Sequence, residues 1–383
     1  MTPNAAGGSR RRAVLLGAGH AHLHALKRAA EFARRGHELV VVSPEAFWYS
    51  GLATGMLGGS YPPELDQVDV RALTERGGGR FVRGRVTGID PGRQIVRLEG
   101  EPGPLRYDAL SLTLGSHTPP LPGEERAAGC YAAKPIPRLA ALRRDLEARF
   151  RADPARPVRV VVAGGGVTAC ELAANVAALA AARGGRVATT VLAGDRPLRQ
   201  LPERARKTVI ASLERRGVEV RAGGRAGRVE AGRAVLDGQG GHAVPFDVFL
   251  NATGLKPVPL VREVGLPIDR DGALVVDERL RSVADPAVHG GGDCVAYQGR
   301  ELPKVGVYAI RQAPVLFRNL LAALDRTEPE PFEPQRDYLW IMNLGDGTGL
   351  AVRGGLWWHG RAAFWLKDRI DRRFLREYAT PAG

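Results

Sequence analysis

A strand, a glycine turn, a helix and a second strand follow one another twice in this chain, and this repeat constrains the fold more than any other feature. The first copy spans residues 12–42, and its turn reads Gly17-Ala18-Gly19. The second copy spans residues 158–192, with the turn Gly164-Gly165-Gly166. Each copy has the order of a βαβ unit, in which a crossover helix joins two parallel strands. We therefore predict two parallel-sheet domains of similar architecture.

Both turns place glycines where a dinucleotide requires them. The first glycine permits a tight turn, and the second lets the backbone approach a pyrophosphate at the N-terminus of the next helix. Where a third glycine is common, the first turn has His22 and the second has Ala169. Glu171 lies in the first turn of the second helix, where its charge opposes the helix dipole. The sequence thus predicts one dinucleotide at each turn.

The strand after each helix is followed by residues that could bind the ribose of a nucleotide. An acidic residue about 20–26 positions after the turn commonly binds the ribose hydroxyls. The first copy offers Ser43, with Glu45 just beyond it, and the second offers Asp195 beside Arg196. An acid favours NAD and an arginine favours the 2′-phosphate of NADP, so the sequence leaves the choice between NADH and NADPH open.

Two further stretches match each other. Asp108 and Asp247 each precede an apolar strand that ends in a small-residue turn, at Thr113-Leu114-Gly115 and at Thr253-Gly254. Such a turn lets the backbone pass close to a ligand or to a crossing chain. Further on, Gly290-Gly291-Gly292-Asp293 follows a strand end, and its aspartate is placed to hydrogen-bond a sugar alcohol such as the ribityl chain of a flavin.

In this order, the motifs resemble those of the pyridine-nucleotide-disulfide oxidoreductase superfamily, and within it the type II NADH dehydrogenase branch. The chain is still more similar to the FAD-dependent module that some bacteria fuse ahead of selenophosphate synthetase. That similarity rests on the Gly-x-Gly-His-x-His turn and on the segments 49–52, 309–314 and 367–374. The resemblance covers nearly the whole chain, residues 11–378.

The resemblance implies an α/β protein with two Rossmann-like dinucleotide-binding domains, of the glutathione-reductase-like three-layer ββα type, and a small C-terminal α+β region. The NAD(P)-binding domain would be inserted into a discontinuous FAD-binding domain. The expected segments are 10–120 and 247–327 for FAD, 121–246 for NAD(P), and 328–383 for a C-terminal region with an amphipathic basic helix.

The resemblance also implies roles for individual residues. FAD would meet the first turn with its pyrophosphate and the segment 48–52 with its ring, and a helix from about Ala309 would point its positive end at that ring. The residues expected to bind FAD are Gly17, Gly19, His20, Ser43, Glu45, Tyr49, Ser50, Gly51, Thr113, Gly115, Gly292 and Asp293. The other expected cofactor-binding residues are Gly164, Gly166, Glu171 and Gly254, and those expected as catalytic residues are Lys304 and Gln312. No metal site is expected.

The expected activity is oxidation of NAD(P)H through FAD, with electrons passed to a quinone or another acceptor. Disulfide reductases of the superfamily need a redox-active cysteine pair, and the segment 49–56 has none. Sulfide:quinone reductases use two cysteines beside the flavin, so Cys130 and Cys294 leave that alternative open, although Cys294 and Cys170 read as small buried hydrophobes. A further alternative is a redox-sensing or partner-binding flavoprotein with little turnover, linked to selenium metabolism.

The C-terminal segment allows two interpretations. Residues 353–378 hold seven Lys or Arg against three Asp or Glu, together with several aromatic residues. A single helical stripe would contain Leu366, Ile370, Phe374 and Tyr378. A basic amphipathic helix with aromatic flanks can lie among lipid headgroups, so 355–378 is a candidate for peripheral membrane contact. The other interpretation is a helix packed on the protein itself or on the partner of a homodimer.

Composition and charge argue against a nucleic-acid-binding, a membrane-spanning or an exported protein. The 383-residue chain carries a formal net charge of +14, but its basic residues are scattered and form no recognised nucleic-acid-binding module. No uncharged apolar run is long enough to span a membrane. Three distant cysteines fit a reducing compartment, and the basic stretch over residues 1–12 is interpreted as a tail rather than an export signal. We expect a cytoplasmic protein, with the inner face of the cell membrane as the alternative location, and no nucleic-acid partner.

Overall fold

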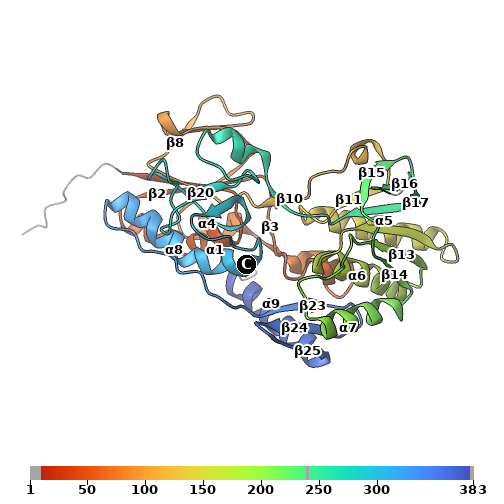
Figure 1. Ribbon diagram of the computed structural model, residues 1–383. Helices are drawn as coiled ribbons and strands as arrows, with labels where there is room; N and C mark the ends of the chain where they lie inside the picture. The colour runs from red at the N-terminus through yellow and green to blue at the C-terminus, as the bar shows by residue number, and fades with distance from the viewer. Residues whose placement is uncertain (1–9, 239–240, 380–383) are drawn as a thin grey trace, which may run out of the picture.

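The computed structural model describes residues 10–238 and 241–379, so residues 1–9 of the predicted basic tail lie outside the described residues. Figure 1 shows two lobes side by side, with a smaller C-terminal unit beneath them. Among the described residues, no helix combines the length and the apolar character needed to cross a bilayer.

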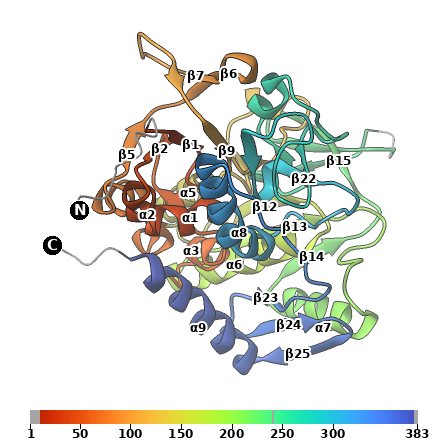
Figure 2. The same cartoon turned by 90° about the vertical axis from the view of Figure 1, so that its left-hand side faces the viewer.

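The first lobe is built on a five-stranded parallel sheet. In spatial order its strands are β21 (Val288–Gly290), β9 (Ala109–Leu112), β1 (Arg12–Leu16), β2 (Glu38–Ser43) and β5 (Arg80–Arg83). The central strands β1 and β2 contain buried apolar runs, residues 13–16 and 39–42, as expected for a parallel sheet covered on both faces. The helices α1 (His20–Lys27) and α8 (Gly306–Asp325) pack side by side and lie against this sheet (Figure 2).

The sequence pattern of residues 20–35, with Leu23, Leu26, Ala30 and Ala33 on one side, predicts a single helix, but the structure has two. α1 ends at Lys27 and α2 (Ala29–Arg34) begins after a break at Arg28. The buried side continues through Ala29 and Phe32, whereas Ala30 and Ala33, which the single-helix pattern placed inside, are exposed. The break interrupts the helical register, and this is why the periodicity assigned the wrong residues.

The second lobe repeats the arrangement of the first. Its parallel sheet runs β11 (Cys130–Ala132), β18 (Val248–Asn251), β12 (Val158–Ala163), β13 (Val187–Leu192) and β14 (Val218–Arg221). Its helices are α5 (Pro137–Ala152), α6 (Val167–Arg183) and α7 (Glu203–Glu214). The predicted fold class, two Rossmann-like domains in an α/β protein, is confirmed.

The two matched aspartates occupy equivalent places in the two sheets. The carboxylate of Asp108 accepts a hydrogen bond from the backbone N–H of Arg12 at 2.8 Å, and that of Asp247 accepts one from Arg159 at 2.9 Å. β9 and β18 are therefore equivalent strands, each beside the first strand of its βαβ unit. The predicted domain boundary between residues 246 and 247 is wrong, because β18 lies next to β12 inside the second sheet.

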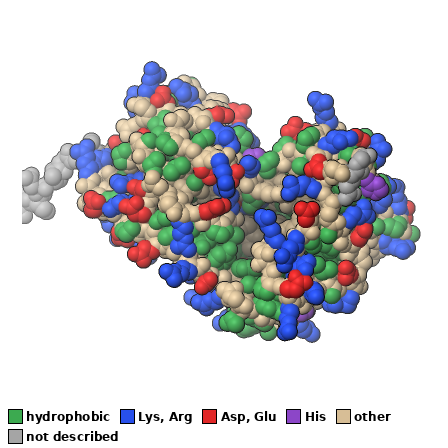
Figure 3. Space-filling model, viewed as in Figure 1, with side chains coloured by type: hydrophobic (Ala, Val, Ile, Leu, Met, Phe, Trp, Pro, Cys, Tyr) green, Lys and Arg blue, Asp and Glu red, His purple; other side chains and the backbone are tan. Residues whose placement is uncertain are grey.

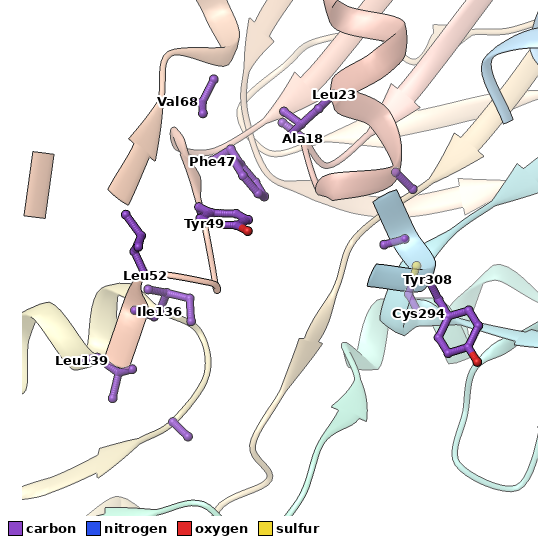
Figure 4. Packing of buried hydrophobic residues seen from close by; sticks show 14 of the residues in the cluster. Ala18, Leu23, Phe47, Tyr49, Leu52, Val68, Ile136, Leu139, Cys294 and Tyr308 are labelled. Carbon is purple, nitrogen blue, oxygen red and sulfur yellow. The ribbon is translucent and has the colours of Figure 1, made fainter. Parts of the chain in front are cut away.

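The chain connects the lobes in three places. β10 (Ser116–His117) and β19 (Lys256–Pro257) pair antiparallel, so the outgoing and returning segments lie side by side. The third connection follows β3 (Phe47–Trp48) and contains α3 (Ala53–Leu57), which packs on α5 and α6 of the second lobe. In Figure 4, Leu52 of this connection lies beside Ile136 and Leu139 of the second lobe.

The C-terminal unit consists of an antiparallel sheet and one helix. The sheet contains β23 (Trp340–Asn343), β24 (Gly349–Arg353) and β25 (Leu356–Gly360), and α9 (Arg361–Tyr378) follows it. The prediction of a small α+β region is confirmed. The unit is not separate, however, since Asn343 hydrogen-bonds Asn175 of α6 and Phe374 stacks on Tyr49 of the first lobe.

Smaller elements complete the two lobes. In the first lobe they are β4 (Gln67–Val68), α4 (Val70–Arg76), β6 (Val86–Asp90), β7 (Ile95–Leu98), β8 (Leu105–Arg106), β20 (Leu274–Val276) and β22 (Val295–Tyr297). In the second lobe they are β15 (Ala226–Glu230), β16 (Arg233–Leu236) and β17 (Ala243–Pro245).

Candidate functional site

The main cavity among the described residues has a volume of about 1140 Å³ and lies between the two lobes and the C-terminal unit. Figure 3 shows the hollow in the surface, with Lys and Arg side chains gathered on its second-lobe side. The first glycine turn contributes His20 to the lining, and the second contributes Gly165 and Gly166. Lys367 and Asp371 of α9 line it as well. His20, directly after the first glycine turn, and the second glycine turn itself therefore face one shared space.

The first glycine turn is held against Thr113 and has no room for larger residues. A Cβ atom on Gly17 or on Gly19 would lie 2.7 Å from the carbonyl oxygen of Thr113. The Thr113 hydroxyl donates to the Gly17 carbonyl at 3.2 Å and accepts from the Gly19 N–H at 3.1 Å. His22, at the position of the usual third glycine, is buried with its Nδ1 2.6 Å from the Gly17 carbonyl oxygen and its Nε2 2.8 Å from the Ser111 hydroxyl.

His20 stands at the start of α1 and faces the cavity. Its Nε2 atom is buried and has no hydrogen-bond partner within residues 10–238 and 241–379. Burial lowers the pKa of His20 to about 4, with a further contribution from the nearby Lys134, so the ring is neutral at pH 7. The ring packs edge-on against Phe47 with centroids 4.7 Å apart. A neutral ring nitrogen without a partner can hydrogen-bond a ligand that reaches it.

The predicted flavin-ring segment is clamped by the C-terminal helix. The Tyr49 ring stacks on Phe374 with centroids 4.6 Å apart, and its hydroxyl donates to Asp371 Oδ1 at 2.8 Å. Lys367 Nζ donates to the Gly51 carbonyl and to Asp371 Oδ2. Sequence reasoning placed Lys367 and Asp371 only within a resemblance motif, although their spacing of four residues puts them on one helix face.

Asp293, predicted at the flavin ribityl chain, lies at the centre of an ion-paired cluster. Its Oδ2 atom accepts from Lys134 Nζ at 2.7 Å and from the Ser116 hydroxyl at 2.7 Å. Burial alone would raise the pKa of Asp293, but Lys134 and Ser116 outweigh that effect and hold the pKa below its usual value. Lys134 was missed because it lies far away in sequence, in the second lobe next to β11. Gly115 precedes Ser116 in a left-handed conformation (φ +74°).

The two residues predicted to be catalytic, Lys304 and Gln312, hold the turn that carries Asp293. Lys304 Nζ donates to the Asp293 carbonyl at 2.9 Å, and Gln312 Oε1 accepts from the Gly292 N–H at 2.8 Å. Gln312 is buried, and neither side chain lines the main cavity. Both polar groups are thus bonded to the backbone of this turn, and their catalytic role stays a prediction.

Ser43 and Glu45 lie at the carboxyl end of β2, where the strand pattern predicted them. The Ser43 hydroxyl donates to the Glu45 carbonyl at 3.0 Å, and the Ser43 side chain is buried. The exposed Glu45 lines a second cavity of about 490 Å³ together with Gln67 and Arg71. Neither residue lines the main cavity, so their predicted contact with the FAD ribose remains a prediction.

The second glycine turn packs as tightly as the first. Gly164 has φ +132°, and a Cβ atom there would lie 2.4 Å from the carbonyl oxygen of Ala252. Gly166 and Gly254 line the main cavity, and α6 begins directly after Gly166 without a side-chain cap. The free N–H groups at the start of α6 are therefore available to an anion.

Glu171 faces the cavity from the first part of α6. Its Oε1 atom accepts from the Asn343 N–H at 2.6 Å and from the Thr54 hydroxyl at 3.5 Å. Burial raises the pKa of Glu171 to about 7, and Lys367 moderates the rise. This carboxyl therefore gains and loses a proton near neutral pH. Thr54 and Asn343 could not be linked to Glu171 from the sequence, since the three residues lie in α3, β23 and α6, far apart in the chain.

None of the three cysteines lines the main cavity. Burial raises the pKa of Cys130 to about 11, of Cys170 to about 12 and of Cys294 to about 11. All three thiols are therefore protonated at neutral pH and poor nucleophiles.

The hydrogen-bonding groups around the first glycine turn fit FAD. The glycine cradle admits no side chain, α1 starts without a side-chain cap and without an acidic residue in its first turn, and the His20 Nε2 atom is buried without a partner among the described residues. A pyrophosphate would satisfy the free N–H groups of α1, and a neutral histidine adds no charge to repel a flavin.

A dinucleotide turn in each lobe, a cavity that both His20 and the second turn line, and one domain inserted in the other are the features of a flavin- and nicotinamide-dependent oxidoreductase. Residues 11–313 match the family model described as pyridine nucleotide-disulphide oxidoreductase. The chain belongs to this family, and FAD and NAD(P)H are its cofactors. The resemblance predicted for the superfamily is thereby confirmed.

Known relatives cover the chain to different extents. The nitric oxide reductase FlRd-NAD(+) reductase of Aeromonas hydrophila is 29% identical over 281 residues, which are 66% of this chain and 65% of that protein. The chain thus spans slightly less than two thirds of the length of that relative. The demethylphylloquinone reductase NdbB of Synechocystis sp. is 27% identical over 369 residues, covering 91% of this chain and 87% of that protein. The structure of NDH2 from Plasmodium falciparum in complex with NADH shares the fold, with a TM-score of 0.81, 14% identity and 96% coverage of each chain.

Proposed function

We propose that this protein is a quinone reductase that oxidises NAD(P)H. FAD, when bound, supplies the redox chemistry by accepting a hydride from NAD(P)H and passing two electrons to the quinone. The observation that carries the proposal is the cavity shared by His20, directly after the first glycine turn, and by the second glycine turn, with no cysteine among its described lining residues. The similarity to a demethylphylloquinone reductase over 91% of the chain supports a quinone as the acceptor.

The residues around the cavity have separate tasks in this proposal. His20 offers an uncharged ring nitrogen beside the first turn. The Tyr49 ring lines the cavity, with Phe374 stacked on it, and the hydrogen bond from Tyr49 to Asp371 fixes its position. Lys304 is a positioning residue, because it holds the backbone of the turn that presents the Asp293 carboxylate.

Glu171 is the cavity carboxyl that we assign to proton exchange. Reduction of a quinone to a quinol consumes two electrons and two protons, so the cavity needs a group that can release a proton near neutral pH. Glu171, with a pKa raised to about 7 by burial, is suited to this task, and the Asn343 N–H fixes its Oε1 atom. A carboxyl whose pKa lies near the working pH is an efficient proton donor.

The sulfide:quinone alternative lacks the cysteines it needs. Cys130 and Cys294 do not line the main cavity, and their thiols have pKa values raised to about 11 by burial. Sulfide oxidation through a protein disulfide requires thiolates at the flavin. We therefore keep quinone reduction by NAD(P)H as the proposed activity.

We also propose that the C-terminal unit contacts the membrane, through Ile370 of the predicted stripe and through apolar residues outside that stripe. Phe374 and Tyr378 of that stripe pack on the protein, Phe374 against Tyr49 and Tyr378 against Phe374. The large apolar side chains that remain exposed in this unit are Leu356 (76% exposed), Trp365 (62%), Ile370 (44%) and Trp358 (39%). Aromatic and aliphatic side chains beside arginines suit a headgroup layer. Co-sedimentation with anionic vesicles should fall several-fold in the double variant Leu356→Ser, Trp365→Ser, and equal binding would refute this contact.

Stopped-flow spectroscopy tests the proposed activity. NADPH or NADH should bleach the flavin of the holoprotein, and a water-soluble quinone should restore its absorbance within the same catalytic cycle. Sulfide in place of the nucleotide should leave the flavin oxidised. If no nicotinamide nucleotide bleaches the flavin, the proposed activity is wrong, and a low-turnover flavoprotein becomes the better reading.

A further inference from the structure

We infer that the second nucleotide site selects the 2′-phosphorylated nucleotide, so that NADPH rather than NADH is the reductant. This inference rests on the proposed function and specifies the substrate of the same site. It concerns the loop after β13, where the sequence alone offered an acid and an arginine side by side.

The end of β13 lacks a carboxylate for a ribose diol. The strand ends at Leu192 and is followed by Ala193, which is buried, and by Gly194. A Cβ atom on Gly165 of the glycine turn would lie 3.1 Å from the Ala193 side chain, so position 193 fits a small residue. A Cβ atom on Gly194 would meet nothing within 4 Å. The strand end therefore leaves open space where NAD-specific sites place an acid.

A strained and buried turn then folds the next residues over the glycine turn. Leu198 is fully buried and adopts a left-handed conformation (φ +52°), which is costly for a leucine. Its N–H donates to the Gly165 carbonyl at 2.7 Å. The Gln200 amide nitrogen lies 4.0 Å from the position of a Cβ atom on Gly166. The loop is thus fixed against the turn that would hold the nucleotide pyrophosphate.

This loop and the segment before β15 bring arginines to the same cavity. Arg196, Arg199 and Arg225 all line it. Within the described residues, the guanidinium groups of Arg199 and Arg225 have no hydrogen-bond or ion-pair partner. The guanidinium of Arg196 is 3.6 Å from Glu203, but that carboxylate already pairs with Arg206 at 2.6 Å.

The charge balance favours a phosphate over two hydroxyls. Asp195 is the single carboxylate that this loop contributes to the cavity lining, against three guanidinium groups. Bound NADH brings only the charges of its pyrophosphate, which the free N–H groups of α6 can bind, whereas NADPH adds a 2′-phosphate with close to two further negative charges at neutral pH. Guanidinium groups bind phosphate oxygens through paired, charge-assisted hydrogen bonds. Figure 3 shows the Lys and Arg side chains gathered on this side of the hollow.

Two measurements on the holoprotein test the inference. The first compares kcat/KM for NADPH and NADH, with the same quinone, in the wild-type protein and in Arg199→Ala and Arg225→Ala. We expect wild type to prefer NADPH at least about 10-fold, and each variant to lose about 10-fold or more for NADPH while changing less than about 3-fold for NADH. Arg204→Ala is the control, because Arg204 is an exposed α7 arginine that does not line the cavity.

The second measurement is binding without turnover. Adenosine 2′,5′-bisphosphate should bind wild type more tightly than adenosine 5′-diphosphate, and Arg199→Ala should erase that difference. A wild-type preference for NADH, or an equal loss for both nucleotides in the arginine variants, overturns the inference while the proposed oxidoreductase activity stands. If neither nucleotide bleaches the flavin, the proposed function fails, and the adenosine bisphosphate comparison still decides between the two nucleotide classes.

Discussion

Asp66 should make this protein less stable as the pH rises, and Asp66→Asn should remove that loss. The Asp66 side chain is fully buried, and both its carboxylate oxygens lack a hydrogen-bond partner among the described residues. Burial raises its pKa from 3.8 to about 8, and the neighbouring Asp371 adds to the rise. The folded protein therefore keeps a proton that the unfolded chain releases above about pH 4.

The magnitude follows from the two pKa values. A raised folded-state pKa means that stability is present in full at low pH and is lost as pH rises from about 4 to about 8. Between about pH 5.5 and about pH 9, the difference in bound protons between the folded and unfolded states, summed over pH, amounts to roughly two and a half pH units. At ~1.4 kcal/mol per unit, the free energy of unfolding falls by about 3 kcal/mol over this interval. Asp66→Asn titrates in neither state, so relative to wild type it should gain about that amount over the same interval.

Thermal unfolding of the FAD-saturated protein measures this difference. We expect the Tm of Asp66→Asn to rise relative to wild type by about 3–6 °C more at pH 9 than at pH 5.5. Asp247→Asn is the control, because the ion pair with Arg159 lowers the Asp247 pKa to about 2 and its stabilisation is complete well below pH 5.5. Asp247→Asn should be destabilised equally at both pH values. A Tm difference between Asp66→Asn and wild type that does not change with pH would refute the reasoning.

Two further predictions concern the cavity. Thr113→Val removes both hydrogen bonds from the side chain to the first glycine turn and should weaken FAD binding about 10-fold or more, as measured by titrating FAD into apoprotein; unchanged affinity would contradict the role given to Thr113. In wild type, quinone reduction should slow as the pH rises through about 7 because Glu171 loses its proton, and in Glu171→Gln this limb of the pH profile of kcat should disappear. A limb that persists in Glu171→Gln would assign the proton to another group.

Much of the fold could be predicted because it depends on local sequence. The second βαβ unit ends at Leu192 as predicted, and both glycine turns lie between strand and helix as expected. Asp108 and Asp247 mark equivalent strands, since each carboxylate bonds the backbone of the neighbouring first strand. The domain boundary failed because strand order depends on contacts between segments about 90 residues apart, such as β12 with β18.

Some residues of the candidate site could likewise be predicted from the sequence, and others could not. The sequence by itself determined the glycine turns, Thr113 and Glu171, because turn geometry and helix position follow from neighbouring residues. Only the tertiary structure paired Lys134 with Asp293 and turned α9 towards the flavin-ring segment. It alone also showed that Lys304 and Gln312 are bonded to backbone, and that Arg199 and Arg225 line one space. Charge pairing and burial depend on distances through space, and side chains far apart in the chain acquire those distances only when the lobes and the C-terminal unit pack together.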